Sequence, residues 1–280
     1  MDSEKIDLEG AAGRLVADRW SADDERGVVL LLHGGGQTRH SWHRSGPRFA
    51  AAGWTTIALD ARGHGDSAWA EDGDYSMDAL VGDLAAVASQ LAIEPVLVGA
   101  SMGGMTSLIA VGESAVAARA LVLVDVAPRT EPEGVKRILD FMASAPDGFA
   151  TLEDVADAVA AYNPHRPRPK NLDGLKKNVR QGPDGRWRWH WDPAFLQVRD
   201  EPSRATRQDR LGPAAERVQV PTLLVRGAQS DVVSAEGAEE LQRLIPHAVV
   251  REAAAGHMVA GDDNDVFAHQ VVEFLESSGA

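Results

Sequence analysis

Short hydrophobic runs alternate with helical patterns along the first half of the chain. Four runs have the length of a strand and no polar alternation, namely Val28–Leu32, Thr55–Leu59, Pro95–Val98 and Ala120–Val124. Uninterrupted apolar runs are typical of strands buried on both faces of a sheet. Between the second and third runs, leucine and valine recur at helical spacing over residues 80–91, after Ser76 as a possible N-cap. This alternation predicts a parallel sheet with right-handed helical crossovers.

The pattern changes after Asp125 and resumes near residue 218. Prolines mixed with aromatic residues fill the interval, including Asn163–Pro169, which predicts an inserted, mainly helical segment with an apolar inner face. The later pattern predicts strands at Thr222–Val225 and Ala248–Arg251, a helix at Ala235–Leu244, and a terminal helix that begins near Asp262, Asp263 and Asp265. We therefore expect a core of residues 1–127 and 218–280, interrupted after the sixth core strand by a cap of residues 128–217.

Composition narrows the classes of partner. The chain has 280 residues, no cysteine and a formal net charge of −14, so it lacks disulfides and cysteine nucleophiles and should repel nucleic acid and anionic membrane surfaces. It shows neither a signal peptide at its start nor an apolar run of membrane-spanning length. We expect a cytoplasmic protein that acts on a small molecule, and the sequence leaves its oligomeric state open.

The sharpest chemical signal is Gly99-Ala100-Ser101-Met102-Gly103-Gly104, directly after the third strand. A strand followed by a tight turn and a helix holds a serine in a strained conformation at the carboxyl edge of the sheet, and the flanking glycines relieve crowding. The helix N-terminus favours negative charge beside it. Ser101 is therefore the candidate nucleophile.

A second glycine-rich turn, His33-Gly34-Gly35-Gly36, follows the first strand. Backbone amides in such a turn can stabilise the oxyanion of acyl transfer. We assign one donor to the amide of Met102 and the other to that of Gly35, with Gly36 as the alternative. His33 itself is expected to be a structural hydrogen-bonding residue.

A serine nucleophile needs a base, and the base needs an acid. His257 follows the last predicted strand and should lie at the same sheet edge as Ser101. Asp231, after strand Thr222–Val225, is the preferred acid. Asp125, after strand Ala120–Val124, is the alternative that could reach the same imidazole.

Together these segments resemble the α/β-hydrolase fold superfamily, in the form of a serine hydrolase with an inserted cap. The matching pieces span residues 28–257 and also include Asp60-Ala61-Arg62-Gly63-His64-Gly65-Asp66-Ser67. The resemblance implies a mostly parallel sheet flanked by helices, Ser101, Asp231 and His257 as the triad, and the Met102 amide as an oxyanion donor. It implies that Arg62 and His64 brace a loop. Related epoxide hydrolases and haloalkane dehalogenases carry aspartate at the nucleophile position, so Ser101 argues against both.

The candidate pocket is less well determined. Residues 186–191 alternate Arg-Trp-Arg-Trp-His-Trp, so an extended chain would put three indoles on one face and the basic residues on the other. The indoles could form the cap core, or one could face the pocket while Arg188 or His190 meets a substrate carboxylate. Candidate pocket residues are Gly36, Trp42, Trp187, Trp189, Trp191 and Met258. His43, beside Trp42, is a further candidate, with helix packing as the alternative for both.

We therefore expect a serine hydrolase that cleaves a small to medium, largely apolar ester or lactone through an acyl-enzyme on Ser101, without metal or cofactor. The same triad would serve a C–C bond hydrolase of ring-cleavage products or a cofactor-free perhydrolase. A ligand-binding receptor that has lost turnover is the alternative from another class.

Overall fold

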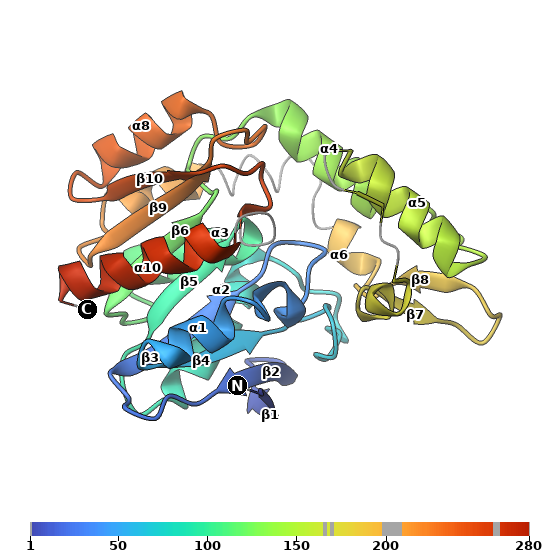
Figure 1. The fold of residues 1–280 in the computed structure, drawn as a ribbon, viewed down its shortest axis with the longest axis horizontal. Coiled ribbons are helices and arrows are strands. Elements are labelled where there is room, and N and C mark those ends of the chain that lie inside the picture. Colours follow the sequence, from blue (N-terminus) through green and yellow to red (C-terminus); the bar gives the residue numbers. More distant parts are fainter. Residues whose placement is uncertain (1, 165–166, 169–170, 198–208, 260–263, 280) are drawn as a thin grey trace.

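An eight-stranded sheet forms the centre of the computed structural model, which describes residues 2–164, 167–168, 171–197, 209–259 and 264–279 (Figure 1). Its strands, in spatial order, are β1 (Glu4–Glu9), β2 (Arg14–Trp20), β4 (Trp54–Leu59), β3 (Gly27–Leu32), β5 (Val96–Ala100), β6 (Ala120–Val124), β9 (Thr222–Gly227) and β10 (Val249–Ala253). β1, β2 and β4 pair antiparallel, and the strands from β4 to β10 run parallel. The carboxyl ends of these parallel strands therefore share one edge, where ligands bind in open α/β sheets.

Helices cover both faces of the sheet. They are α1 (Gly46–Ala51), α2 (Met77–Ser89), α3 (Met102–Gly112), α8 (Ala235–Leu244) and α10 (Asn264–Ser278). Alternate residues of each strand supply two hydrophobic cores, as the period of a strand requires. Leu30 packs in one core with residues of α2, α3 and α8. Leu31 packs in the other with Phe49 of α1 and Phe267 of α10.

The six strands and the three helices that the hydrophobic pattern predicts are present. Ser76 caps α2 as expected, since its side chain accepts a hydrogen bond from the amide of Ala79 at 3.2 Å. The N-terminal hairpin of β1 and β2 was not predicted, because β1 is an edge strand with largely exposed side chains and lacks an apolar run. Asp262 and Asp263 lie outside the described residues.

The chain between β6 and β9 contains several short elements. They are α4 (Pro132–Met142), α5 (Leu152–Tyr162), the 3₁₀ helix η2 (Asp173–Lys177), β7 (Val179–Gln181), β8 (Trp187–Trp189) and α6 (Ala194–Gln197). Most of them lie to one side of the sheet in Figure 1. A small hydrophobic core of their own, centred on Phe149, Val155 and Val179, holds α5, η2 and the β7–β8 pair together. The segment is thus helical with one small hairpin, and part of its proline-rich stretch lies outside the described residues.

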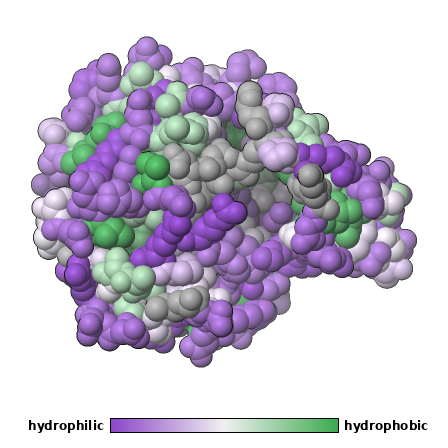
Figure 2. All heavy atoms as spheres, viewed as in Figure 1, coloured by the Kyte–Doolittle hydropathy of each residue, from purple (hydrophilic) through white to green (hydrophobic). Residues whose placement is uncertain are grey.

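The surface is polar over most of the face seen in Figure 2. Hydrophobic patches on that face are small and scattered. Among the described residues, no helix has the length and the apolar character needed to cross a membrane.

Candidate active site

Ser101 occupies the turn between β5 and α3 with an unusual backbone. Its φ of 46° and ψ of −111° lie outside the regions that a serine ordinarily adopts. Such strain is typical of a functional turn that the surrounding structure holds in place. The turn sets Ser101 at the carboxyl end of β5, where it lines a cavity.

The glycines around Ser101 are required by close packing. A Cβ atom on Gly99 would lie 2.4 Å from the carbonyl oxygen of Gly103, and one on Gly103 would lie 2.4 Å from that of Leu32. Gly104 would meet a side-chain methyl of Val126 at 2.4 Å. These contacts are far shorter than van der Waals distances, so each position must be glycine for β5, α3 and β3 to approach as they do.

The second glycine turn leaves one amide unused. The Gly34 amide donates to Gln37 Oε1 at 3.0 Å, and the Gly36 amide donates to His64 Nε2 at 3.1 Å. Within the described part of the chain, the amides of Gly35 and Met102 have no hydrogen-bond acceptor. A Cβ on Gly34 would lie 3.3 Å from that of Ser101, so this turn borders the serine. Gly35 and Met102 are therefore the amides available to an oxyanion, and the alternative donor, Gly36, is occupied.

His257 pairs with Asp125, the residue that directly follows β6. Its Nδ1 lies 2.7 Å from Asp125 Oδ2, and the carboxyl side chain is fully buried. An Nδ1–H donated to this carboxylate leaves Nε2 unprotonated and able to accept a proton. Across the residues that the structure describes, neither His257 Nε2 nor Ser101 Oγ has a hydrogen-bond partner. Both residues line the same cavity.

The preference for Asp231 as the partner of His257 is wrong in this structure. Asp231 is exposed and forms an ion pair with Arg137 of α4 at 2.7 Å. It lies four residues beyond the end of β9, in a loop that turns towards α4, whereas Asp125 directly follows a strand end. The alternative acid, Asp125, makes the contact that was expected of Asp231.

Three groups hold the Asp125 carboxylate. Its Oδ1 accepts a hydrogen bond from the amide of Gly227 at 2.8 Å, and its Oδ2 accepts one from the hydroxyl of Ser230 in addition to that from His257. The backbone of Asp125 has a φ of 49°, a conformation that is uncommon outside glycine but that aspartate and asparagine adopt more often than other residues. Several partners thus fix one orientation of a fully buried carboxylate.

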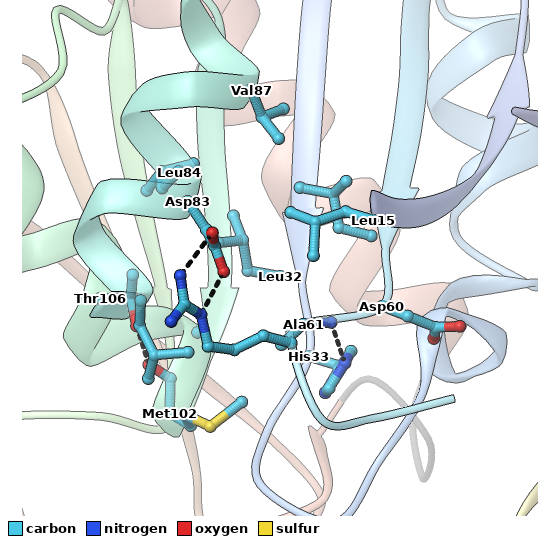
Figure 3. Close-up of a pocket in the computed structure, with 14 residues that line it drawn as sticks. Leu15, Leu32, His33, Asp60, Ala61, Asp83, Leu84, Val87, Met102 and Thr106 are labelled. Carbon is cyan, nitrogen blue, oxygen red and sulfur yellow. Dashed lines mark hydrogen bonds and ion pairs between the residues drawn. The ribbon is translucent and has the colours of Figure 1, made fainter. Parts of the chain in front are cut away.

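The loops around the site are braced as the sequence suggested. Arg62 donates two hydrogen bonds to Asp83, which is labelled in Figure 3, with Nε–Oδ2 and Nη2–Oδ1 distances of 2.6 and 2.7 Å. In the same view His33 Nε2 accepts from the amide of Ala61 at 3.0 Å. Its Nδ1 faces the Gly34 carbonyl, and burial lowers the pKa of His33. The rings of His33 and His64, which flank the glycine turn, thus both accept hydrogen bonds from backbone amides.

The cavity at Ser101 has a volume of about 410 Å³, a size that suits a small to medium ligand. Of the residues predicted to line it, Gly36, Trp42, Trp189, Trp191 and Met258 do so. Trp187 does not; it packs with the small core of the β6–β9 segment. The sequence did not identify the apolar wall contributed by α4 and α5, which consists of Ile138, Phe141, Met142, Val159 and Tyr162. The strongly amphipathic pattern of α4 is the sequence feature that could have predicted this wall.

The aromatic residues of this wall are in mutual contact. Trp189 stacks on Trp191 with ring centroids 5.0 Å apart, and Phe141 stacks on Tyr162 at 4.1 Å. Phe141 also meets Trp189 at 5.1 Å. The indole nitrogen of Trp189 is buried, and its N–H has no acceptor among the described residues. The wall that these rings form is therefore largely apolar.

The basic residues beside these indoles face elsewhere. Arg188 pairs with Asp184 at 2.6 Å. His190 is buried, where its Nδ1 accepts from the amide of Gly65 at 2.8 Å and its Nε2 faces the carbonyl of Gly36 at 3.3 Å. Burial lowers the pKa of His190 to about 3, so the ring is neutral at pH 7. Neither Arg188 nor His190 lines the cavity, so the alternative in which one of them contacts a substrate carboxylate has no support in the structure.

His43, a candidate pocket residue, lines the cavity as part of a cluster of titratable groups that the sequence did not predict, near the 3₁₀ helix η1 (Arg39–Trp42). His40 and His43 line the cavity, and both approach Asp18 of β2. Burial, with Arg39 and His43 nearby, lowers the pKa of His40 to about 4. Burial raises the pKa of Asp18, but hydrogen bonds from His43 and Arg39 outweigh it and keep the pKa below its usual value. The spacing of the two histidines, three residues apart, was the available signal.

Comparison with known proteins places the chain in one family. The sequence model of the alpha/beta hydrolase fold matches residues 27–263. The chain is 31% identical to esterase Rv0045c of Mycobacterium tuberculosis, over 90% of this chain and 83% of that protein. A solved structure of that esterase superposes with a TM-score of 0.78, covering 99% of this chain and 93% of the other at 29% identity. That structure is described together with inhibition of the esterase by transition metals.

Two further relatives act on different substrates. A 3-hydroxybutyrate-oligomer hydrolase of Cupriavidus necator is 27% identical over 81% of each chain. A 2-(acetamidomethylene)succinate hydrolase of Mesorhizobium japonicum is 30% identical over 80% of this chain and 79% of that protein. The match to the family, the sheet order and these relatives agree, and the chain belongs to the alpha/beta hydrolase fold family.

Proposed function

We propose that the protein is a serine hydrolase that cleaves carboxylic esters or lactones through an acyl-enzyme on Ser101. The observation that carries this proposal is the joint placement of Ser101 and the His257–Asp125 pair at one cavity, beside two unused backbone amides. Esterase relatives support ester hydrolysis as the reaction class.

The chemistry follows from these groups. His257 Nε2 takes the hydroxyl proton of Ser101 as Oγ attacks the substrate carbonyl carbon. The amides of Gly35 and Met102 stabilise the resulting oxyanion, at roughly 3 kcal/mol for each donor. The imidazolium then protonates the leaving alcohol. Water, deprotonated by His257, releases the acid and restores Ser101.

The substrate class follows from the wall that α4, α5 and β8 contribute. Its residues are mostly aromatic or aliphatic, and the two nearby basic groups of β8 and its flank are turned away. In this proposal the β6–β9 segment acts as a cap that covers the acyl or alcohol group of a small to medium apolar ester. Asn163 and Asn178 also line the cavity and are polar groups available to orient that substrate.

The proposal is tested by intact mass spectrometry after incubation with a fluorophosphonate. Wild type should gain a single adduct, Ser101→Ala none, and His257→Ala should react much more slowly. Ser89→Ala is the matched control, because Ser89 is an exposed residue of α2 whose hydroxyl bonds only its own helix. All assays contain a chelator, since transition metals inhibit the Mycobacterium tuberculosis relative.

Absence of an adduct in folded wild type, or an adduct retained in Ser101→Ala, would overturn the proposal. Once labelling is established, a panel of p-nitrophenyl esters, lactones and ring-cleavage dienoates identifies the bond that is cleaved. We expect the shorter apolar esters to give the highest kcat/KM. A preference for dienoates would instead favour a C–C bond hydrolase with the same triad.

A further inference from the structure

We propose that Asp18, His40 and His43 form a binding site for a divalent transition-metal cation in the wall of the active-site cavity. The site is separate from Ser101, His257 and Asp125, and the proposed hydrolysis does not use it. Asp18 lies on β2, His40 lies within η1, and His43 directly follows η1. Two segments of the fold, β2 and the turn of η1, thus bring two imidazoles and one carboxylate together.

The donor atoms converge on one point. His43 Nε2 lies 2.9 Å from His40 Nδ1 and 2.8 Å from Asp18 Oδ2, and His40 Nδ1 lies 3.6 Å from the same oxygen. Ligand atoms at about 2.1 Å from one metal ion lie roughly 3.0–3.4 Å from one another in octahedral or tetrahedral geometry. The three separations bracket that range, so an ion fits with small side-chain shifts.

Protons alone satisfy this arrangement poorly. His43 Nε2 faces both His40 Nδ1 and Asp18 Oδ2 at hydrogen-bond distance, but a neutral imidazole nitrogen carries at most one hydrogen. If His43 Nε2 donates that hydrogen to Asp18 Oδ2, it has no lone pair left to accept an N–H from His40 Nδ1. His40 Nδ1 can then only share the same hydrogen as a second acceptor. A cation would accept a lone pair from each of the three atoms and remove the conflict.

Neighbouring residues orient the ligands. Arg39 Nε lies 3.0 Å from Asp18 Oδ1, the oxygen that points away from the histidines. The positive charge of Arg39 is also offset by Asp60 and Asp66. The ring of Trp20 packs edge-on against His43, with centroids 5.7 Å apart. Groups that fix the orientation of metal ligands in this way commonly strengthen binding.

The ligand set indicates the class of ion. Two imidazoles and one carboxylate suit Zn²⁺, Co²⁺, Ni²⁺ or Cu²⁺, whereas Mg²⁺ and Ca²⁺ prefer oxygen ligands alone. The side chains of His40 and His43 are 23% and 36% exposed, and both line the cavity. A bound ion with its remaining water ligands would project into the cavity and reduce the room for substrate. We therefore expect occupancy to slow ester hydrolysis.

Calorimetric titration of Co²⁺ and Zn²⁺ into chelator-stripped Ser101→Ala protein tests the site without reference to activity. One ion should bind per chain, and Co²⁺ should give visible d–d absorption. His40→Gln and His43→Gln, each made in the Ser101→Ala background, should weaken binding at least tenfold. His269→Gln is the matched control, because His269 is an exposed histidine of α10.

The outcomes separate this proposal from its rivals. Equal affinity in His43→Gln, His40→Gln and the control would overturn it, as would loss of binding in His257→Gln with retention in His43→Gln, since the ion would then occupy the catalytic histidine. Zn²⁺ should inhibit ester hydrolysis by unlabelled wild type, with recovery on chelation and at least tenfold less sensitivity in His43→Gln. Co²⁺ binding without fluorophosphonate labelling would leave the metal site standing and remove the hydrolase proposal.

Discussion

The loops after β6 and β9 each carry an aspartate near the His257 loop, and only one of them meets the histidine. β6 and β9 are neighbours in the sheet. Asp125 directly follows β6, is fully buried and lies 2.7 Å from His257 Nδ1. Asp231 is the fourth residue after β9, is exposed and pairs with Arg137. Two similar sequence positions thus have different surroundings.

The difference arises from the turn between Gly227 and Asp231. Gly227, the last residue of β9, and Ser230, in the loop that follows, donate hydrogen bonds to the Asp125 carboxylate. The loop after β9 therefore supports the acid of the neighbouring strand and directs its own aspartate towards α4. Asp125 meets His257 because it directly follows the end of β6, whereas the turn after β9 places Asp231 beside α4.

Removal of Ser101 should have the largest effect on activity. It is the reference against which the effects of changing the surroundings of Asp125 and Asp231 are compared. Ser101→Ala lacks the nucleophile, so kcat should fall by about 10⁶-fold for a good ester. Steady-state hydrolysis of p-nitrophenyl acetate measures this. A loss of less than tenfold would mean that neither aspartate serves a serine mechanism.

Alanine substitution of two glycines, one packed against the His257 loop and one against Asp231, tests the two loops separately. A Cβ on Gly227 would lie 2.2 Å from the carbonyl oxygen of Gly256, next to His257, and a Cβ on Gly134 would lie 2.0 Å from that of Asp231. Both alanine variants should lose about 1–3 kcal/mol of unfolding free energy. Only Gly227→Ala should also lose about 100-fold in kcat/KM, because it displaces the histidine loop. Denaturant unfolding and kinetics on both variants check this, and an equal activity loss would contradict it.

Ser230→Ala is a milder change to the support of Asp125. It removes the hydroxyl that donates to Oδ2 and accepts from the amides of Val232 and Val233. We expect kcat/KM to fall about tenfold, the equivalent of one hydrogen bond. Ser234→Ala is the control, because it removes only the N-cap of α8 and should cost about 1 kcal/mol of stability. If both variants kept full activity, the support from Ser230 would be irrelevant to catalysis.

The smallest effect is expected from the Arg137–Asp231 ion pair. Its side chains are 45% and 43% exposed, and exposed pairs contribute about 0–1 kcal/mol. A double-mutant cycle with Arg137→Gln and Asp231→Asn, followed by denaturant unfolding, should give a coupling energy within that range. A coupling above about 2 kcal/mol would show that Asp231 has a structural role that its exposure does not reveal.

Much of the core was predictable because its strands are continuous apolar runs and its turns carry glycine. Ser101, His257 and the Gly35 and Met102 amides were located from those strand ends, and the structure brings Ser101 and His257 to one cavity. The choice between Asp125 and Asp231 was not predictable, since it depends on the course of a four-residue turn. The Asp18–His40–His43 cluster joins Asp18 to two histidines that lie more than twenty positions later in the chain, and no local pattern links β2 to η1.

The wall of the cavity was beyond sequence reasoning for a similar reason. Trp187 and Trp189 share one strand and one face, but β8 sits so that Trp189 and Trp191 reach the cavity and Trp187 does not. The packing of β8 against α4 and α5 decides which indole is used. That packing is a tertiary property of the β6–β9 segment.

The central claim is that Asp125, and not Asp231, orients His257 for attack by Ser101. The most direct test is to measure kcat/KM for one ester, in the presence of chelator, with Asp125→Asn and Asp231→Asn side by side. An amide at residue 125 would favour the wrong tautomer of His257, and we predict a loss of about 10⁴-fold, while Asp231→Asn should stay within about twofold of wild type because it disrupts only an exposed ion pair. A large loss in Asp231→Asn with little change in Asp125→Asn would contradict the account.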